Sequence, residues 1–186
     1  MTNRMKYVLI TGASEGGIGN ALALAILPRI RLCPLPLKDV QPSSLRSSRM
    51  TLLKLDITSP NSIRSTVSTI SSLTNGRLDI LVNNSGQSYL APALDTPLST
   101  IRNLFNVNFF GLVELTQRLS SLIIPTQRTI INIGSLAAHI HPPPLGGILL
   151  SDQSCRAFLW GDTQTRVATV RCESVDGCYW LPCKPT

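Results

Sequence analysis

A glycine-rich turn between a strand and a helix constrains this chain most strongly. The stretch "VLITGASEGGIGNALA" begins at Val8 and ends at Ala23. Its apolar start predicts a strand over Tyr7–Ile10, and its alanine-rich and leucine-rich end predicts a helix over Ile18–Leu27. A strand that passes through a tight turn into a helix is the first half of a βαβ unit, so we expect a parallel sheet with helical crossovers.

The alternation of strand and helix continues through the first 148 residues. Further strands are predicted over Thr51–Ile57, Leu78–Val82 and Thr129–Ile133, and a long helix over Ser99–Leu122. Another helix follows the Ser/Thr cap of "TSPNSIRSTVSTISSL", which has an apolar 3.6-residue period. The pattern predicts an α/β fold, a Rossmann-like doubly wound parallel sheet that is incomplete at its C-terminal side.

Two segments interrupt this pattern. Between Pro28 and Ser48 the alternation calls for a strand, but internal prolines and few β-branched residues disfavour a central one. After Ile148 the chain shows neither a sustained helical period nor a clean strand. We therefore expect one Rossmann-like domain over residues 1–148 and an aberrant, irregular tail over residues 149–186.

Composition excludes several other classes of protein. The net charge of +7 suggests nucleic-acid binding, but the basic residues are scattered from Arg4 to Lys184, which favours a solvated basic surface. No apolar run reaches the roughly 18 residues of a membrane-spanning helix or forms a signal-peptide core. The cysteines lack zinc-site spacing. We expect an intracellular, cytoplasmic protein with no transmembrane segment, no metal and no nucleic-acid partner.

The glycine turn predicts a phosphate site. Gly12 allows a tight exit from the strand, Gly16 and Gly17 remove side chains from the path of a ligand, and Gly19 lets the helix pack closely. The free N–H groups and the positive end of the following helix favour a pyrophosphate. A glycine pattern also occurs in plain loops, but its place between strand and helix favours a dinucleotide site.

Five motifs in order resemble the short-chain dehydrogenase/reductase family, over Lys6 to about Ile148. "TGASEGGIG" resembles the family's nucleotide motif with one extra glycine, a variant typical of fungal members, and "LDIT" resembles its adenine-contacting aspartate. "NNSG" resembles its sheet-stabilising, cofactor-lining motif, "NVNFFG" the asparagine of its central helix, and "INIGSLAA" the serine that hydrogen-bonds the substrate carbonyl. The resemblance implies that cofactor-binding residues are Gly12, Ser14, Gly16, Gly17, Ile18, Gly19, Asp56, Asn83, Ser85, Gly86 and Arg118, and that catalytic residues are Asn108 and Ser135.

Several of these residues also have a purely structural interpretation. Asp56 is suited to cap the next helix, Asn83 to form a turn, and Asn108 to hydrogen-bond in the core. Ser135 is suited to end a strand, and Arg118 to be a solvated helix charge. The shared order and spacing of the motifs favour the functional interpretation over the structural one.

The resemblance carries further implications. It implies NADP or NAD as cofactor, with NADP favoured, and a small-molecule ketone or secondary alcohol as substrate. It also implies a homo-oligomer, which is common in relatives, and peripheral association with membranes or lipid droplets.

The proton donor of this chemistry is absent from the sequence. In the family a tyrosine gives the proton and a lysine four residues later activates it, about a dozen residues after the serine. Here that window reads "PPPLGGILLSDQSCRAF", and after Ser135 the single tyrosine, Tyr179, is followed four residues later by Cys183. The alternatives to an active oxidoreductase are therefore a non-catalytic nucleotide binder and a fragment that folds incompletely.

A shift of reading frame explains this absence. The family's helix Tyr-Ser-Ala-Thr-Lys-Ala-Ala, written as degenerate codons and regrouped one base earlier, permits Leu, Leu, Ser, Asp, Gln, Ser and Cys. That is the stretch Leu149–Cys155, and Phe158–Arg166 continues the agreement. We therefore hypothesise that the tail from about Leu149 is an out-of-frame translation of a dehydrogenase gene.

Overall fold

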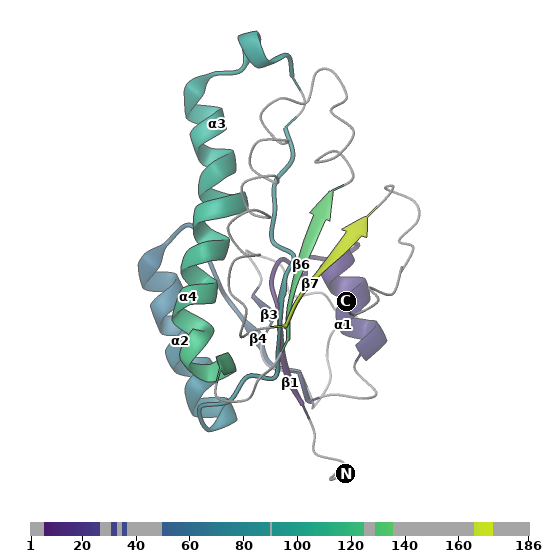
Figure 1. The fold of residues 1–186 in the computed structure, drawn as a ribbon, viewed down its shortest axis with the longest axis vertical. Helices are drawn as coiled ribbons and strands as arrows, with labels where there is room; N and C mark the ends of the chain where they lie inside the picture. Colours follow the sequence, from purple (N-terminus) through teal and green to yellow (C-terminus); the bar gives the residue numbers. More distant parts are fainter. Residues whose placement is uncertain are drawn as a thin grey trace.

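The computed structural model describes residues 6–26, 31–32, 35–36, 50–89, 91–124, 129–135 and 166–172. Figure 1 draws the fold as a ribbon, with the sheet between layers of helices. Within the described part of the chain, a parallel sheet has the strand order β2-β1-β5-β6-β7. Its strands are β1 (Tyr7–Ile10), β2 (Arg31–Leu32), β5 (Ile80–Asn83), β6 (Thr129–Ser135) and β7 (Arg166–Cys172). A second parallel pair joins β3 (Leu35–Pro36) to β4 (Leu52–Leu53). The predicted α/β fold with a parallel sheet is confirmed.

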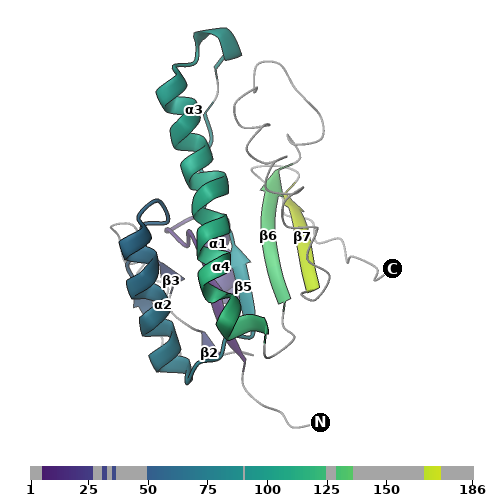
Figure 2. The same cartoon turned by 60° about the vertical axis from the view of Figure 1, so that its left-hand side comes forward.

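Helices cover both faces of the sheet. They are α1 (Ile18–Ile26), α2 (Pro60–Thr74), α3 (Leu98–Phe105) and α4 (Leu112–Ile123), with a short 3-10 turn, η2, at Ala93–Asp95. Helix α1 lies on one face of the sheet, and α2 lies beside α4 on the other (Figures 1 and 2). This is the doubly wound arrangement that helical crossovers between parallel strands produce.

The core follows from the two-residue period of the strands. In β1, Leu9 packs with residues of α2 and α4, whereas Val8 and Ile10 pack with Ala23 of α1. All of these side chains are fully buried. Successive strand residues point to opposite faces, so a continuous apolar strand serves two hydrophobic layers at once.

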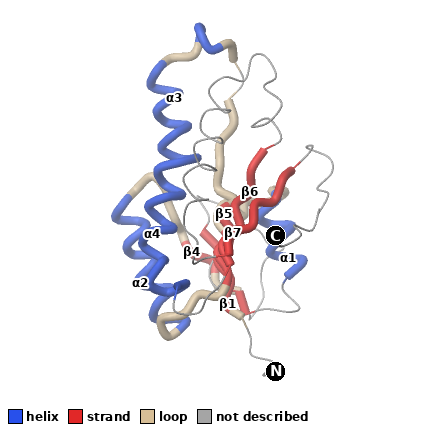
Figure 3. Tube along the Cα trace, in the orientation of Figure 1, coloured by secondary structure: helices blue, strands red, loops and turns tan. Residues whose placement is uncertain are grey.

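The long predicted helix contains an unexpected turn. Helices α3 and α4 are joined by a π-helical turn, η3 (Asn106–Gly111), and together they form one unbroken helical rod (Figure 3). The bounds 98–123 agree closely with the predicted Ser99–Leu122. Turns of this rare type are frequent at functional sites, because they displace side chains from the regular helical positions.

Other strand boundaries differ from the prediction. The segment Thr51–Ile57 contributes only Leu52 and Leu53 to a ladder, and the strand predicted over Leu78–Val82 forms over Ile80–Asn83. The partner of β4 is a two-residue strand that ends at Pro36, which has no backbone N–H to extend the pairing. The segment between Pro28 and Ser48 thus contributes two very short strands, β2 and β3, while the rest of it lies outside the described residues.

The tail also contains regular structure. Strand β7 pairs with β6 along its whole length, from Thr129 opposite Arg166 to Ser135 opposite Cys172. The prediction of an irregular tail is therefore wrong for these seven residues, which include the β-branched Val167, Thr169 and Val170. The remainder of 149–186 lies outside the described residues, and the boundary at 148 stays a prediction.

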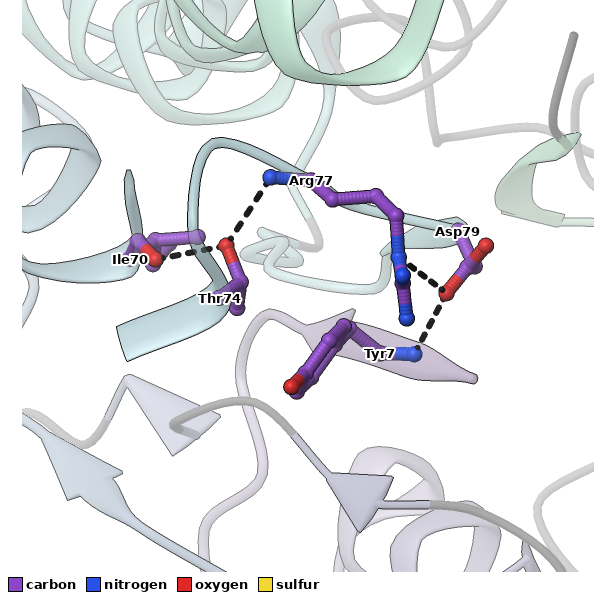
Figure 4. A network of polar contacts seen from close by, with 5 residues as sticks. All are labelled: Tyr7, Ile70, Thr74, Arg77 and Asp79. Atoms are coloured by element: carbon purple, nitrogen blue, oxygen red, sulfur yellow. Dashed lines mark hydrogen bonds and ion pairs between the residues drawn. The ribbon is translucent and has the colours of Figure 1, made fainter. Parts of the chain in front are cut away.

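A polar network holds the amino ends of β1 and β5 together (Figure 4). The buried Asp79 carboxylate accepts a hydrogen bond of 2.8 Å from the Tyr7 backbone N–H, and Arg77 Nε lies 3.6 Å from the same oxygen. The Arg77 guanidinium also stacks 4.9 Å from the centre of the Tyr7 ring. The Thr74 hydroxyl accepts from the Arg77 N–H and donates to the Ile70 carbonyl. These contacts hold β1 and β5 together at the amino-terminal edge of the sheet, opposite the glycine turn.

None of the described helices combines the length and the apolar character that crossing a membrane requires. The cytoplasmic location, the lipid-droplet association and the homo-oligomer stay predictions.

Candidate functional site

The loops that follow β1, β5 and β6 meet at one edge of the sheet. These strands run parallel, so their carboxyl ends lie together, and ligands of open α/β sheets bind at this edge. The loops that follow β1 and β5 carry the glycine turn and the "NNSG" motif, and β6 ends at Ser135. The fold thus brings three of the five predicted motifs to a common edge.

Two glycines of the turn are required by close packing. A Cβ atom on Gly12 would lie 2.8 Å from Ser85 Cα, and one on Gly19 would lie 2.6 Å from Asn84 Nδ2. Gly12 also has a φ of 67°, which L side chains rarely adopt. The turn after β1 therefore packs directly against the loop after β5, and a larger residue at either position would separate the two loops.

Gly16 has a different environment. Its φ is 75°, it is exposed, and a Cβ placed on it would have no neighbour within 4 Å. The exposed Ser14 and Ile18 flank this open point, and the Gly17 N–H is bonded to the Ser14 carbonyl at 3.0 Å. Helix α1 begins at Ile18, so its unpaired N–H groups lie next to the open point. A glycine with open space beside a helix N-terminus fits a diphosphate group.

Thr11 and Asn84 hold the two loops in register, a role that the sequence motifs alone did not assign. The Thr11 hydroxyl accepts hydrogen bonds of 2.9 Å from the backbone N–H groups of Asn84 and Ser85. The Asn84 amide donates in return to the carbonyls of Thr11 and Gly12, at 2.9 and 2.8 Å. The "TG" at the start of the turn motif was the available signal, but its partner Asn84, directly after β5, is 73 residues away.

Asn83 is buried in a network across two strands. It faces Asn132 in the β5–β6 register, and its Nδ2 donates to Asn132 Oδ1 at 2.9 Å and to Thr116 Oγ1 of α4 at 3.3 Å. Asn83 is 2% exposed, and its Oδ1 has no hydrogen-bond partner among the described residues. The alternative of Asn83 as a turn former is wrong, because the residue ends a strand and ties β5 to β6 and α4.

Asp56 forms the turn that precedes α2. Its Oδ1 accepts from the Thr58 N–H at 2.9 Å and from the Thr58 hydroxyl at 2.7 Å, while the cap of α2 is Ser59. The structural interpretation is therefore correct in part: Asp56 shapes the entry to the helix, although it is not the capping residue. The side chain stays partly exposed, and a contact with adenine remains a prediction.

Asn108 lies in the π-helical turn and holds the loop after "NNSG". Its Oδ1 accepts from the Gln87 N–H at 2.8 Å, and its Nδ2 donates to the Gln87 carbonyl at 2.9 Å. A Cβ on Gly86 would meet Asn108 Oδ1 at 3.6 Å, which is ordinary contact distance. Asn108 is thus buried and joined to the chain segment that contains Ser85 and Gly86. Gln87 was missed because it binds through its backbone, which leaves no trace in the sequence.

The remaining predicted residues are less connected. Ser135 is the last residue of β6, and the segment 136–165, where the missing tyrosine and lysine would fall, lies outside the described residues. Arg118 pairs with Glu114 on α4, with Nη2 2.9 Å from Oε1, and no described contact joins it to the glycine turn. The ion pair accounts for Arg118 as a surface charge of the helix, and its cofactor role stays a prediction.

Comparisons with known proteins identify relatives of this architecture. The family model described as short chain dehydrogenase matches residues 6–146. A short-chain dehydrogenase of Penicillium crustosum is 42% identical over 143 residues, which are 76% of this chain and 53% of the relative. The NADPH-dependent 1-acyldihydroxyacetone phosphate reductase of Schizosaccharomyces pombe is 35% identical over 136 residues, 73% of this chain and 46% of that protein. The chain spans about half the length of these curated relatives.

The fold is also shared with solved structures. An alcohol dehydrogenase from the archaeon Thermococcus sibiricus, complexed with 5-hydroxy-NADP, superposes with a TM-score of 0.81 at 21% identity, covering 90% of this chain and 76% of that one. At this identity the likeness concerns the fold alone. The match of the family model over most of the chain and the identity to the fungal relatives establish more: the chain belongs to the short-chain dehydrogenase family of oxidoreductases.

Proposed function

We propose that this chain binds NAD(P) across the carboxyl edge of its sheet and descends from an oxidoreductase of ketones or secondary alcohols. The observation that carries the proposal is the open Gly16 beside the N-terminus of α1, in a turn that packs tightly on the loop after β5. Backbone N–H groups and the helix dipole favour a diphosphate there, and the absence of a side chain leaves room for it.

The other site residues extend from this point in two directions. Asp56 contacts the adenine from the loop after β4, and Ser14, Gly17 and Ile18 surround the diphosphate. On the other side, Ser85 and Gly86 would line the nicotinamide. They follow Asn83, which ties β5 to β6, and precede Gln87, whose backbone Asn108 holds. A bound nicotinamide would supply or accept a hydride in the reaction of the ancestral oxidoreductase, in which Ser135 would polarise the substrate carbonyl.

We expect NADP to be preferred over NAD. The relative from Schizosaccharomyces pombe is named as NADPH-dependent, and it is 35% identical to this chain. A comparison of the dissociation constants of NADPH and NADH tests the preference, and equal or tighter binding of NADH would contradict it.

We further propose that these 186 residues do not turn over a substrate. The window after Ser135 lacks the Tyr-x-x-x-Lys motif, and proton transfer by a positioned group alone contributes roughly 10² to 10⁴-fold to a rate. Consumption of NADPH is to be followed with a panel of ketones, against a blank that contains cofactor and ketone without protein. A rate above the blank would show that another group supplies the proton.

A matched pair of variants tests the binding site. Asp and Asn have nearly the same shape and both tolerate the left-handed backbone of Gly16, so Gly16→Asp and Gly16→Asn differ mainly in charge. An added carboxylate within about 4 Å of a diphosphate weakens binding by on the order of 1 kcal/mol or more, so Gly16→Asp binds NADPH roughly tenfold more weakly than Gly16→Asn at low salt. Equal affinities of the two variants would place the diphosphate elsewhere.

Direct titration separates this proposal from the alternatives. Saturable binding of NADPH that excess NADP displaces supports a nucleotide binder. An unfolded chain by circular dichroism, with no binding, would favour an incompletely folding fragment. Salt-sensitive binding of DNA without binding of NADPH would instead support a nucleic-acid protein that uses its basic surface.

A further inference from the structure

Gly111 lies where the long helical rod touches the loop after β4. It is the buried last residue of the π-helical turn η3. A Cβ placed on Gly111 would overlap the carbonyl oxygen of Ile57 and would lie 2.8 Å from Ile57 Cγ1 and 3.0 Å from the Asn106 carbonyl. Two of these three atoms belong to backbone carbonyls, which cannot move away as the end of a flexible side chain does. Only glycine fits between η3 and this loop.

The neighbours of Ile57 form the turn of Asp56. Thr58 donates two hydrogen bonds to Asp56 Oδ1, and the Asp56 N–H donates to the hydroxyl of Ser62 in the first turn of α2, at 2.9 Å. Ile57 lies between these two bonded residues and is itself 9% exposed, in the core that contains Val107. A displacement of Ile57 by η3 therefore moves the Asp56 carboxylate as well.

The same π-helical turn also positions the other half of the site. Asn108, three residues before Gly111, holds both backbone groups of Gln87 in the loop after β5. One turn of the rod thus contacts both the loop after β4 and the loop after β5. A regular α-helix would rotate one of these two contacts out of place, because a π-helical turn contains an additional residue.

We propose that Gly111 is a positioning residue for the adenosine half of the dinucleotide. The inference rests on the proposed function, in which Asp56 contacts the adenine. Gly111 sets the distance between the rod and the Asp56 turn. Asn108 instead fixes the position of the loop of the nicotinamide half, through its separate pair of hydrogen bonds to Gln87. The two halves therefore respond differently to a change at residue 111.

The variant Gly111→Ala tests this division, with AMP and nicotinamide mononucleotide as separate probes. We expect AMP to bind roughly tenfold more weakly to the variant than to the unaltered chain, which is the loss of about one hydrogen bond. The affinity for nicotinamide mononucleotide is expected to change less than about twofold, because the bonds of Asn108 to Gln87 are retained. A purely structural defect would weaken both probes equally.

Gln117→Ala is the matched control. It also introduces alanine in the same helical rod, but Gln117 is exposed on α4. Alanine has a higher helix propensity than either glycine or glutamine, so helix propensity alone would stabilise both variants. We expect a lower melting temperature for Gly111→Ala and an unchanged or higher one for Gln117→Ala. A higher melting temperature for Gly111→Ala would show that the close contact does not exist, and would overturn the inference.

A measurement on the unaltered chain keeps the inference testable if Gly111→Ala does not fold. In a two-dimensional NMR titration with AMP, the amide signals of Thr58 and Gly111 are expected to shift with the same apparent dissociation constant, while nicotinamide mononucleotide leaves Gly111 unshifted. AMP binding that shifts Thr58 without Gly111 would overturn the inference. AMP and NADPH that both fail to bind would instead contradict the proposed function on which it rests.

Discussion

Single residues in this protein combine structural and functional tasks. Asp56 shapes the entry to α2 with Oδ1, and its partly exposed side chain is also the one proposed to contact the adenine. Asn108 is a buried hydrogen-bonding residue, as its structural interpretation predicts, but the backbone that it holds is the loop of the proposed nicotinamide half. For these two side chains the observed structural contacts are therefore compatible with the proposed functional tasks, which stay predictions.

Thr11 provides a test at this scale. Replacing it with valine removes the hydroxyl that accepts from the Asn84 and Ser85 N–H groups, and leaves two partly buried donors without this partner. We expect Thr11→Val to lower the free energy of unfolding by about 2 kcal/mol in urea denaturation. Thr11→Ser keeps the hydroxyl and is expected to lose less than half as much. An equal loss in both variants would show that the methyl group, not the hydroxyl, stabilises the two loops.

The buried carboxylate at the opposite edge provides a second test. Asp79→Asn keeps the shape of the side chain but weakens its contacts with the Tyr7 N–H and with Arg77. We expect a loss of about 1 to 3 kcal/mol in the free energy of unfolding, because hydrogen bonds to charged groups are stronger than those to neutral ones. The site lies at the other edge of the sheet, so the affinity for NADPH is expected to stay within about twofold. A large loss of affinity without a loss of stability would contradict this separation of the two edges.

At the scale of helices and strands, local sequence patterns predicted those elements whose formation depends on residues close together in the sequence. The apolar period of "SIRSTVSTISSL" and the serine before it predicted α2, because a cap and an amphipathic face are both encoded within a few residues. The π-helical turn at 106–111 was not predicted; its last residue, Gly111, packs against Ile57, which is more than 50 residues away and therefore outside any local pattern. Strand β7 was missed for a similar reason, since its ladder partner is distant in sequence.

The capping serine of α2 can be tested directly. The Ser59 hydroxyl accepts from the Ser62 N–H, and its backbone has the extended conformation of a cap. We expect Ser59→Ala to lower the free energy of unfolding by about 1 kcal/mol. Ser68→Ala, an exposed position within the same helix, is the control and should leave stability unchanged or slightly raised, because alanine favours the helix. Equal effects of the two substitutions would exclude a capping role for Ser59.

At the scale of the whole molecule, the sequence predicted the parallel sheet and the family, and both predictions are confirmed. The glycine turn, "NNSG" and Asn108 could be predicted as a site because their order along the chain resembles that of the family's motifs, and their role in dinucleotide binding stays a prediction. The hydrogen bonds that join Thr11 to Asn84 and Asn108 to Gln87 could not, because they use backbone groups that every residue has. The change of character near Ile148 agrees with the extent of the family match, which ends at residue 146.

The reading-frame hypothesis is a prediction for the gene as a whole. If the tail from about Leu149 is out of frame, a neighbouring frame of the transcript encodes Tyr-x-x-x-Lys immediately after "GGI". Sequencing the transcript across this region provides the check, with the unshifted segment before Ile148 as an internal control. A transcript with no such motif in any frame would refute the hypothesis.

As proposed above, the chain retains the dinucleotide site of its family but lacks the proton donor. A fluorescence titration of NADPH into the 186-residue chain is the decisive test. We expect a saturable signal with one site per chain, which excess NADP reverses and which added ketone leaves unchanged over time. A folded chain that shows no saturation, or a bound NADPH signal that decays when ketone is added, would contradict it.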